Sequence, residues 1–148
     1  MRVPGRWIAG GLVAFAALFG AALFYAQNYA FYERAAGVGA LKVGERVVPI
    51  SDYDGIDATS SPLKLRGCFR VDPAMLADAP LAERAQPLVA PFWFDCFDAE
   101  AIANDLAAGR AVAYRLESDR PEGFDLYVAV YADGRGYLWR QLNEKFAE

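Results

Sequence analysis

The chain has 148 residues, with 15 basic and 19 acidic side chains, two cysteines and no histidine. This length corresponds to one domain. Because there is no histidine, the chain lacks the residues for a Ser-His-Asp triad, a histidine phosphorelay or a histidine-ligated metal site. The formal net charge of -4 argues against nucleic acid as a partner.

The first predicted element is a transmembrane anchor over residues 7–32, which carry no charged side chain and are mostly apolar. About 20 helical residues cross the roughly 30 Å hydrocarbon layer. Trp7 near one end, and Tyr25, Tyr29 and Tyr32 near the other, are expected at headgroup depth. A cleaved signal peptide is the alternative, although this apolar run exceeds the usual core of about 7–15 residues.

The charges on either side of this segment predict its orientation. Arg2 and Arg6 lie on its N-terminal side, whereas its C-terminal side begins with the nearly neutral pair Glu33-Arg34. Because excess positive charge stays in the cytoplasm, the N-terminus is predicted inside and the rest of the chain outside. The predicted division is a cytoplasmic N-terminus at 1–6, a transmembrane anchor at 7–32, a linker at 33–44 and an α+β domain at 45–148.

Small residues form one stripe along the predicted transmembrane helix. Their spacings of four, three and four residues place them on one helix face. They are Gly10, Ala14, Ala17 and Ala21. Small side chains let helix backbones approach closely in lipid, so the stripe is a candidate contact with a membrane-protein partner or a second copy of the chain. A segment that is simply rich in alanine and glycine is the alternative.

Two strands are predicted early in the outer domain. Residues 46–50 form a short strand that Pro49 restricts to a sheet edge, and residues 63–71 form a half-buried strand. A polar loop is predicted between them, at 51–62. The second strand alternates, with one face formed by Leu63, Leu65, Phe69 and Val71 and the other by Lys64, Arg66, Cys68 and Arg70.

One helix and a hairpin are predicted in the second half of the domain. Asp98 can cap a helix at 98–109, and Gly109 can end it, before a strand at 111–116. Residues 124–142 form a hairpin around the two-residue turn Asp133-Gly134, and both of its faces are apolar, so it is central or covered. The resulting register pairs Val130 with Tyr137, Val128 with Trp139, and Tyr131 with Gly136. These elements predict an α+β domain with a mostly antiparallel sheet and one main helix.

The two cysteines, Cys68 and Cys96, both lie in the part predicted to be outside. An oxidising compartment makes a disulfide the first expectation. Cys68 lies among basic side chains and Cys96 in the acidic stretch 95–100, so opposite charges are expected to pair around the bridge. Two buried free thiols are one alternative. A redox or metal role is another, but there is no C-x-x-C motif and two thiolates do not complete a zinc site.

The segment at 91–94 contains three consecutive aromatic residues, Phe92, Trp93 and Phe94. Neighbouring side chains of an extended segment point in opposite directions, so at least one ring, with Trp93 the first choice, is expected at the surface or under the disulfide. An exposed aromatic ring marks a candidate partner contact. Packing of the segment in the core remains the favoured interpretation, and a partner contact is the alternative.

Groups for catalysis and for cofactors are not recognisable in the sequence. The carboxylates at 52–57 surround Gly55, but their spacing is not that of a calcium-binding loop and is typical of a solvated turn. Asp98 and Glu100 are explained by capping and by the helix dipole. We therefore predict no enzyme, no catalytic residue, no cofactor and no metal site.

Several stretches resemble a family of short single-pass alphaproteobacterial membrane proteins of unknown function. They are Ser60–Phe69, Phe92–Ile102, Ala132–Asn143 and Tyr29–Glu33. The resemblance implies the same single-pass topology and brings no established activity. Members are often labelled histidine kinase, but this chain has no histidine to accept a phosphate and no nucleotide-binding motif.

The sequence thus predicts a non-enzymatic domain, anchored in a bacterial inner membrane and facing the periplasm, that acts by interaction as an accessory part of a membrane complex. The small-residue stripe and the aromatic segment would carry this role. The alternative is a periplasmic module that binds a small molecule or an envelope component, with the hairpin face lining its site.

Overall fold

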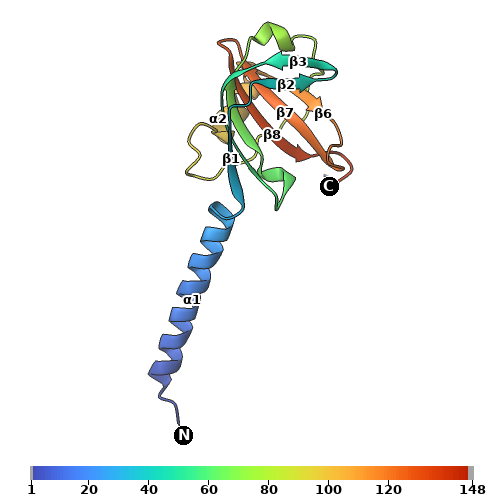
Figure 1. Ribbon diagram of the computed structural model, residues 1–148. Coiled ribbons are helices and arrows are strands. Elements are labelled where there is room, and N and C mark those ends of the chain that lie inside the picture. The colour runs from blue at the N-terminus through green and yellow to red at the C-terminus, as the bar shows by residue number, and fades with distance from the viewer. Residues whose placement is uncertain (1, 147–148) are drawn as a thin grey trace. The chain divides into compact units, whose positions relative to one another are not determined.

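The computed structural model describes residues 2–146, and the chain divides into two compact units between Phe31 and Tyr32. The first unit contains helix α1, Gly5–Asn28 (Figure 1). Its 24 residues correspond to a length of about 36 Å, which is enough to cross the hydrocarbon layer. No residue of α1 is buried, and its length and composition are those of a helix that could span a membrane.

The helix is shorter than the predicted anchor, and strands lie where the sequence suggested a linker. The side-chain amide of Asn28 donates a hydrogen bond to the carbonyl of Phe24 at 3.0 Å, where α1 ends. Strand β1 then begins at Tyr32 (Tyr32–Ala36), and β2 covers Ala40–Val43. Their pairing partners come later in the chain, so the short local pattern does not reveal them.

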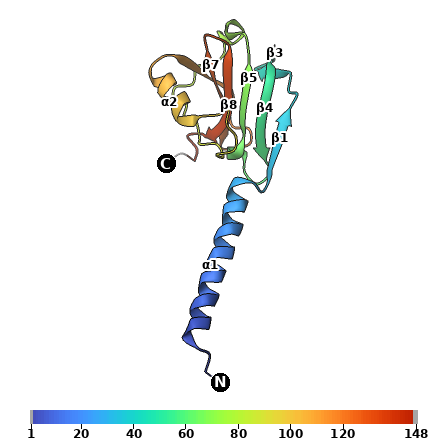
Figure 2. The ribbon, with the colours of Figure 1, turned by 90° about the vertical axis from the view of Figure 1, so that its left-hand side faces the viewer.

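The main sheet has six antiparallel strands in the order β1-β4-β5-β8-β7-β6 (Figure 2). Strands β2 and β3 form a separate ribbon. The remaining elements are β3 (Arg46–Pro49), β4 (Ser51–Ala58), η1 (Pro62–Lys64), β5 (Arg66–Arg70), η2 (Pro73–Leu76), α2 (Ala99–Ala107), β6 (Ala111–Glu117), β7 (Phe124–Tyr131) and β8 (Arg135–Leu142). The predicted α+β fold, with an N-terminal helix, a mostly antiparallel sheet and one main helix, is confirmed.

Apolar side chains cover both faces of the main sheet. On one face, the β2–β3 ribbon contributes Val48 to a cluster that includes Phe69 of β5. On the other face, Ile102 of α2 and Phe94 of the preceding loop pack with Trp139 of β8. This double cover explains why both faces of the β7–β8 hairpin are apolar, as the sequence suggested.

Strand β4 occupies much of the predicted polar loop at 51–62, and it lies inside the sheet, between β1 and β5. The ring of Tyr53 lies close above two glycines. A Cβ atom on Gly55 or Gly67 would lie 2.6 or 2.9 Å from atoms of the Tyr53 side chain. The glycines therefore make room for the ring, and this arrangement depends on a neighbouring strand that the local pattern does not show.

Helix α2 and strand β6 agree closely with the prediction. The carboxylate of Asp98 accepts a hydrogen bond from the N–H of Ala101 at 3.0 Å, which is an N-cap contact. Gly109 follows the helix with a φ of 75°, the left-handed conformation that ends a helix. Both signals act over a few residues, so the sequence alone is sufficient to place this helix.

The β7–β8 hairpin is confirmed, but its register is shifted by one residue from the predicted one. Val130 lies opposite Gly136, not opposite Tyr137. Three residues connect the strands, and Gly134, at a φ of 93°, donates its N–H to the carbonyl of Tyr131 at 3.0 Å. This is a type I turn followed by a left-handed glycine, the usual three-residue hairpin connection.

The shifted register changes which side chain covers Gly136. A Cβ atom on Gly136 would lie 2.3 Å from the ring of Phe69, its partner on β5. Phe69 therefore covers this glycine, and not Tyr131, which the predicted register paired with it. Tyr131 instead meets Tyr137 edge-to-face, with ring centroids 5.7 Å apart.

Candidate functional site

A disulfide joins Cys68 on β5 to Cys96 in the segment before α2, as predicted. The two Cα atoms lie 6.3 Å apart, within the usual range for a disulfide. In the chain-entropy model, closing a loop of this size removes about 3.5 kcal/mol of unfolded-state entropy. The bridge attaches the segment before α2 to the centre of the sheet, and it is typical of a protein in an oxidising compartment.

Three of the charged side chains that were expected to pair around this bridge make other contacts. Asp98 caps α2. Arg70 donates a hydrogen bond to the main-chain carbonyl of Asp133 at 3.4 Å. Arg66 is buried, with only 5% of its surface exposed, although its strand face was predicted to be the polar one.

The guanidinium of Arg66 is bound by main-chain carbonyls. Nε donates to Leu88 O at 2.9 Å and Nη2 to Val89 O at 3.1 Å, while Nη1 donates to the carbonyls of Leu65 at 2.6 Å and Leu63 at 2.5 Å. Burial lowers the pKa of Arg66 to about 10, with an opposing contribution from Tyr32, so the side chain is charged at neutral pH. Arg66 therefore fixes the loop at 88–89 to the start of β5.

The three rings of the aromatic segment lie in three environments. Phe94 is 2% exposed and belongs to the core cluster with Trp139. Trp93 is partly buried and meets Tyr32 edge-to-face, with ring centroids 5.7 Å apart. Phe92 is 64% exposed. The expectation of at least one ring at the surface is thus met by Phe92, whereas Trp93 packs partly against β1.

Cations lie over two of the neighbouring rings. The guanidinium carbon of Arg34 is 6.0 Å from the Trp93 ring centroid, and Lys64 Nζ is 4.9 Å from the Tyr32 ring centroid. These are cation–π distances. Arg34 also lies 3.8 Å from the carboxylate of Asp54, in an exposed ion pair. We name the surface formed by Tyr32, Arg34, Lys64, Val89, Phe92 and Trp93 the aromatic–basic surface.

The main chain that carries the exposed apolar side chains of this surface is fixed to the sheet by other contacts. Val89 is 83% exposed, but its carbonyl accepts the hydrogen bond from Arg66. Phe92 is close in sequence to the buried Phe94 and to the disulfide at Cys96. An apolar surface on a loop that is fixed at several points is typical of a contact site.

A second surface feature is a shallow depression of about 440 Å³ beside the β7–β8 turn. It is lined by Asp105, Arg110, Tyr131, Ala132, Asp133 and Arg135. The hydroxyl of Tyr131 donates to Asp105 at 2.6 Å, and burial together with this bond raises the pKa of Tyr131. Arg110 and Arg135 form ion pairs with Asp105 and Asp133 at 2.7 and 2.8 Å. A charged ligand would therefore compete with contacts that already exist.

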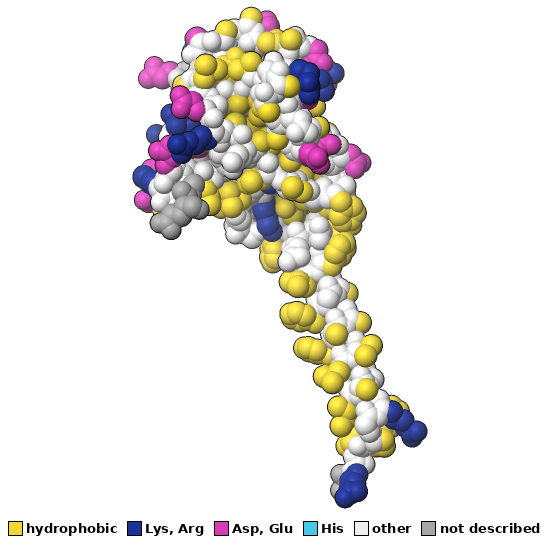
Figure 3. All heavy atoms as spheres, turned by 180° about the vertical axis from the view of Figure 1, so that it is seen from behind, with side chains coloured by type: hydrophobic (Ala, Val, Ile, Leu, Met, Phe, Trp, Pro, Cys, Tyr) yellow, Lys and Arg dark blue, Asp and Glu magenta, His cyan; other side chains and the backbone are white. Residues whose placement is uncertain are grey.

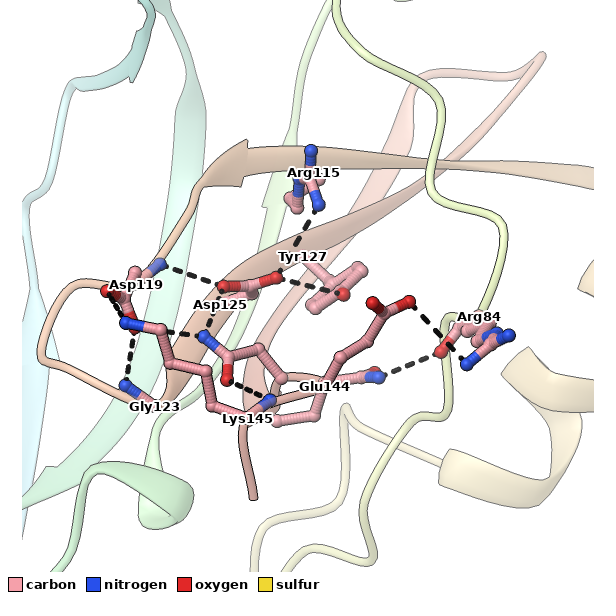
Figure 4. Close-up of polar contacts among 10 residues, drawn as sticks. Arg84, Arg115, Asp119, Gly123, Asp125, Tyr127, Glu144 and Lys145 are labelled. Atoms are coloured by element: carbon pink, nitrogen blue, oxygen red, sulfur yellow. Dashed lines mark hydrogen bonds and ion pairs between the residues drawn. The ribbon is translucent and has the colours of Figure 1, made fainter. Parts of the chain in front are cut away.

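A polar network attaches the segment after β8 to the loop between β6 and β7 (Figure 4). Asp125 is buried and accepts hydrogen bonds from the N–H of Asp119 at 2.8 Å and from Asn143 at 3.3 Å. Asp119 accepts from the N–H of Gly123 at 2.7 Å and from Lys145 at 2.6 Å. These hydrogen bonds lower the pKa of Asp119 to about 2. The network has a structural role.

The predicted helix-packing residues lie along one exposed face of α1. They are Gly10, Ala14, Ala17 and Ala21. A Cβ atom on Gly10 would meet nothing within 4 Å, so this face has space for a close neighbour. Figure 3 shows hydrophobic side chains along the whole helix and basic side chains at its N-terminal end.

Comparison with known proteins identifies the family. Residues 38–148 match the model of a family described as a family of unknown function, DUF6446. Searches of curated proteins and of solved structures found no match. The matched region begins just before β2 and includes both cysteines, α2 and the β7–β8 hairpin. The predicted resemblance to a family without a known activity is confirmed, and the chain belongs to this family of unknown function.

Proposed function

We propose that this protein is a membrane-anchored interaction domain, without enzymatic activity of its own, that serves as an accessory part of a membrane assembly. In this proposal, α1 anchors the chain in a bacterial inner membrane, residues 1–6 are cytoplasmic and the folded domain faces the periplasm. The apolar helix, with Arg2 and Arg6 at its N-terminal end, supports this topology. The disulfide supports an oxidising compartment.

The observation that carries the proposal is the aromatic–basic surface. Phe92 and Val89 are highly exposed, yet the main chain around them is fixed by Arg66 and by the disulfide. Keeping exposed apolar side chains on an ordered loop gives no folding benefit, because it leaves them in water. Such a loop is better explained by contact with a partner than by packing within the domain.

The helix stripe provides a second route for assembly. Small residues on one face let another helix approach closely in lipid, so a membrane-protein partner or a second copy of the chain can pack there. A partner bound in this way would be lost when the stripe becomes bulky.

The test is purification of the tagged full-length chain in mild detergent, with mass spectrometry of the proteins that accompany it. We expect a stoichiometric companion, or a homo-oligomer, that is lost in the double variant Ala14→Leu, Ala17→Leu. The matched control is Ala16→Leu, Ala22→Leu, which adds the same bulk well away from the stripe, since successive residues are about 100° apart around the helix. Equal loss of the companion or homo-oligomer in both variants would contradict the role of the stripe.

A periplasmic ligand-binding module is the second candidate. The depression beside the β7–β8 turn favours it, because the hairpin lines this depression and Tyr131 and Arg135 offer a ring and a cation there. Thermal unfolding of the full-length protein with small molecules and cell-envelope fragments tests this role. A shift that Tyr131→Phe abolishes would favour the binding module over the accessory role.

A further inference from the structure

We propose that the aromatic–basic surface binds the anionic headgroup layer of the membrane, so that lipids with a net negative charge are its partner. This inference rests on the proposed function for the anchor and its orientation, and it names the partner of the same surface. Protein contacts would then be made through the α1 stripe.

The chemistry of the surface fits a lipid interface. Arg34 and Lys64 supply two cations, and both are positioned against aromatic rings. Aromatic rings with a polar edge favour the headgroup region, and basic side chains are attracted to anionic lipids. Phe92 and Val89 add exposed apolar groups that can enter the boundary between headgroups and acyl chains. This combination of cations, amphipathic rings and apolar side chains is typical of proteins that lie on membranes.

The covalent chain limits how far the surface can be from the bilayer. Only residues 29–31 separate the end of α1 at Asn28 from Tyr32 of β1. Four residue steps span at most about 14 Å even when fully extended. Tyr32 therefore stays within reach of the headgroup layer whatever the orientation of the domain.

Charge favours binding of anionic lipid at this surface over binding at the rest of the domain. Acidic side chains outnumber basic ones by 19 to 15 in the whole chain, so its net charge of -4 opposes non-specific binding to anionic headgroups. Asp54 partly offsets the charge of Arg34, and Lys64 lies over the Tyr32 ring. Each basic side chain near an anionic membrane changes the ratio of bound to unbound domain by about fivefold, which corresponds to about 1 kcal/mol.

The test measures the position of Trp93 relative to lipid. The full-length chain carrying Trp7→Phe is reconstituted into nanodiscs of phosphatidylcholine alone or mixed with phosphatidylglycerol, each with a lipid brominated near the headgroup. Trp93 then dominates the quenchable fluorescence, because Trp139 is fully buried. A further Trp93→Phe variant gives the background. We expect quenching to be several-fold stronger in the anionic discs and to weaken with added salt, because salt screens exposed charges.

Two charge variants separate this surface from a general charge effect. Arg34→Gln with Lys64→Gln should remove most of the anionic-lipid effect, whereas Lys42→Gln with Arg120→Gln removes the same charge elsewhere and should preserve it. Circular dichroism and disulfide formation check that each variant folds. Equal quenching in both kinds of disc, or equal loss in both variants, overturns the lipid partner.

Failure of the proposed function gives a different result. Protease digestion of spheroplasts reports whether the domain faces the periplasm, and co-purification reports a protein partner. Neither depends on lipid charge. If the aromatic–basic surface is shielded from solvent only when a protein companion is present, the lipid proposal is overturned and the interaction role is left intact.

Discussion

Arg66 stabilises the domain through hydrogen bonds to carbonyls in two segments, before β5 and in the loop at 88–89. A buried acceptor that loses its donor costs about 1–3 kcal/mol. We expect Arg66→Met to lower the free energy of unfolding by about 3 kcal/mol, and Arg66→Lys nearly as much, because an ammonium group cannot replace the forked guanidinium. Urea unfolding measures this, with the exposed Arg70→Met as the control. Similar losses at both positions would contradict this role.

Asp119 makes the stability of the domain depend on pH in the acid range. Its pKa falls from 3.8 to about 2 in the folded chain, chiefly through the N–H of Gly123 and also through Lys145 and Asn143. Because the folded pKa is the lower one, the unfolded chain binds the proton first. The contribution of Asp119 is therefore complete above about pH 4 and is lost as the pH falls to about 2.

The expected result is a steeper loss of stability between about pH 4 and pH 2 in the native chain than in Asp119→Asn, which has no proton to bind. Urea unfolding at several pH values measures the two slopes. Asp95→Asn, which changes a carboxylate outside the network, is the matched control. Parallel curves for the native chain and Asp119→Asn would show that Asp119 is not responsible.

At the residue scale, the sequence predicts which face of the sheet a side chain points to better than it predicts whether that side chain is buried. Alternation in the strand at 63–71 correctly placed Phe69 and Cys68 on opposite faces of the sheet. It did not predict that Arg66, on the polar face, is buried. The two-residue period of a strand shows which face of the sheet a side chain points to. Arg66 is buried because the loop at 88–89, more than 20 residues away in sequence, covers it.

At the element scale, the β7–β8 turn is tested at Asp133. The predicted two-residue turn needs positive φ at both Asp133 and Gly134, so Asp133→Gly would stabilise it. In the structure Gly134 has the positive φ, and the Asp133 carboxylate accepts a hydrogen bond from the N–H of Arg135 at 3.1 Å. We expect Asp133→Gly to lower the free energy of unfolding by about 1 kcal/mol, because it adds backbone freedom and removes this contact. Thermal unfolding decides between the turns, since a gain in stability would favour the two-residue form.

Elements with local signals were predictable, and those that depend on distant partners were not. Asp98 and Gly109 mark the two ends of α2 within the sequence. In contrast, β4 reads as a polar loop because its stability comes from pairing with β1 and β5 and from the fit of Tyr53 over glycines. The Asp-Gly pair suits both hairpin turns, so it identified the hairpin but not its register.

At the scale of the whole molecule, the sequence was sufficient to predict the disulfide but not the aromatic–basic surface. The disulfide follows from having only two cysteines, both outside the apolar segment. The aromatic–basic surface brings together β1, the end of η1 and the loop before α2. These segments are far apart in sequence, and only the strand order β1-β4-β5 brings the first two close. The sequence therefore indicated Phe92 and Trp93 without their basic neighbours.

The two core clusters on the faces of the sheet predict that the domain can fold without α1. Every described member of both core clusters lies at Tyr32 or later in the chain. The apolar cores and the disulfide are thus complete without α1. We expect a chain that begins at Tyr32 to form the Cys68–Cys96 bridge and to unfold cooperatively, with a free energy of unfolding within about 0.5 kcal/mol of the full-length protein, as for a change outside the core. Near-ultraviolet circular dichroism during thermal unfolding measures this, and a broad transition without fixed aromatic signals would show that the helix unit is needed for folding.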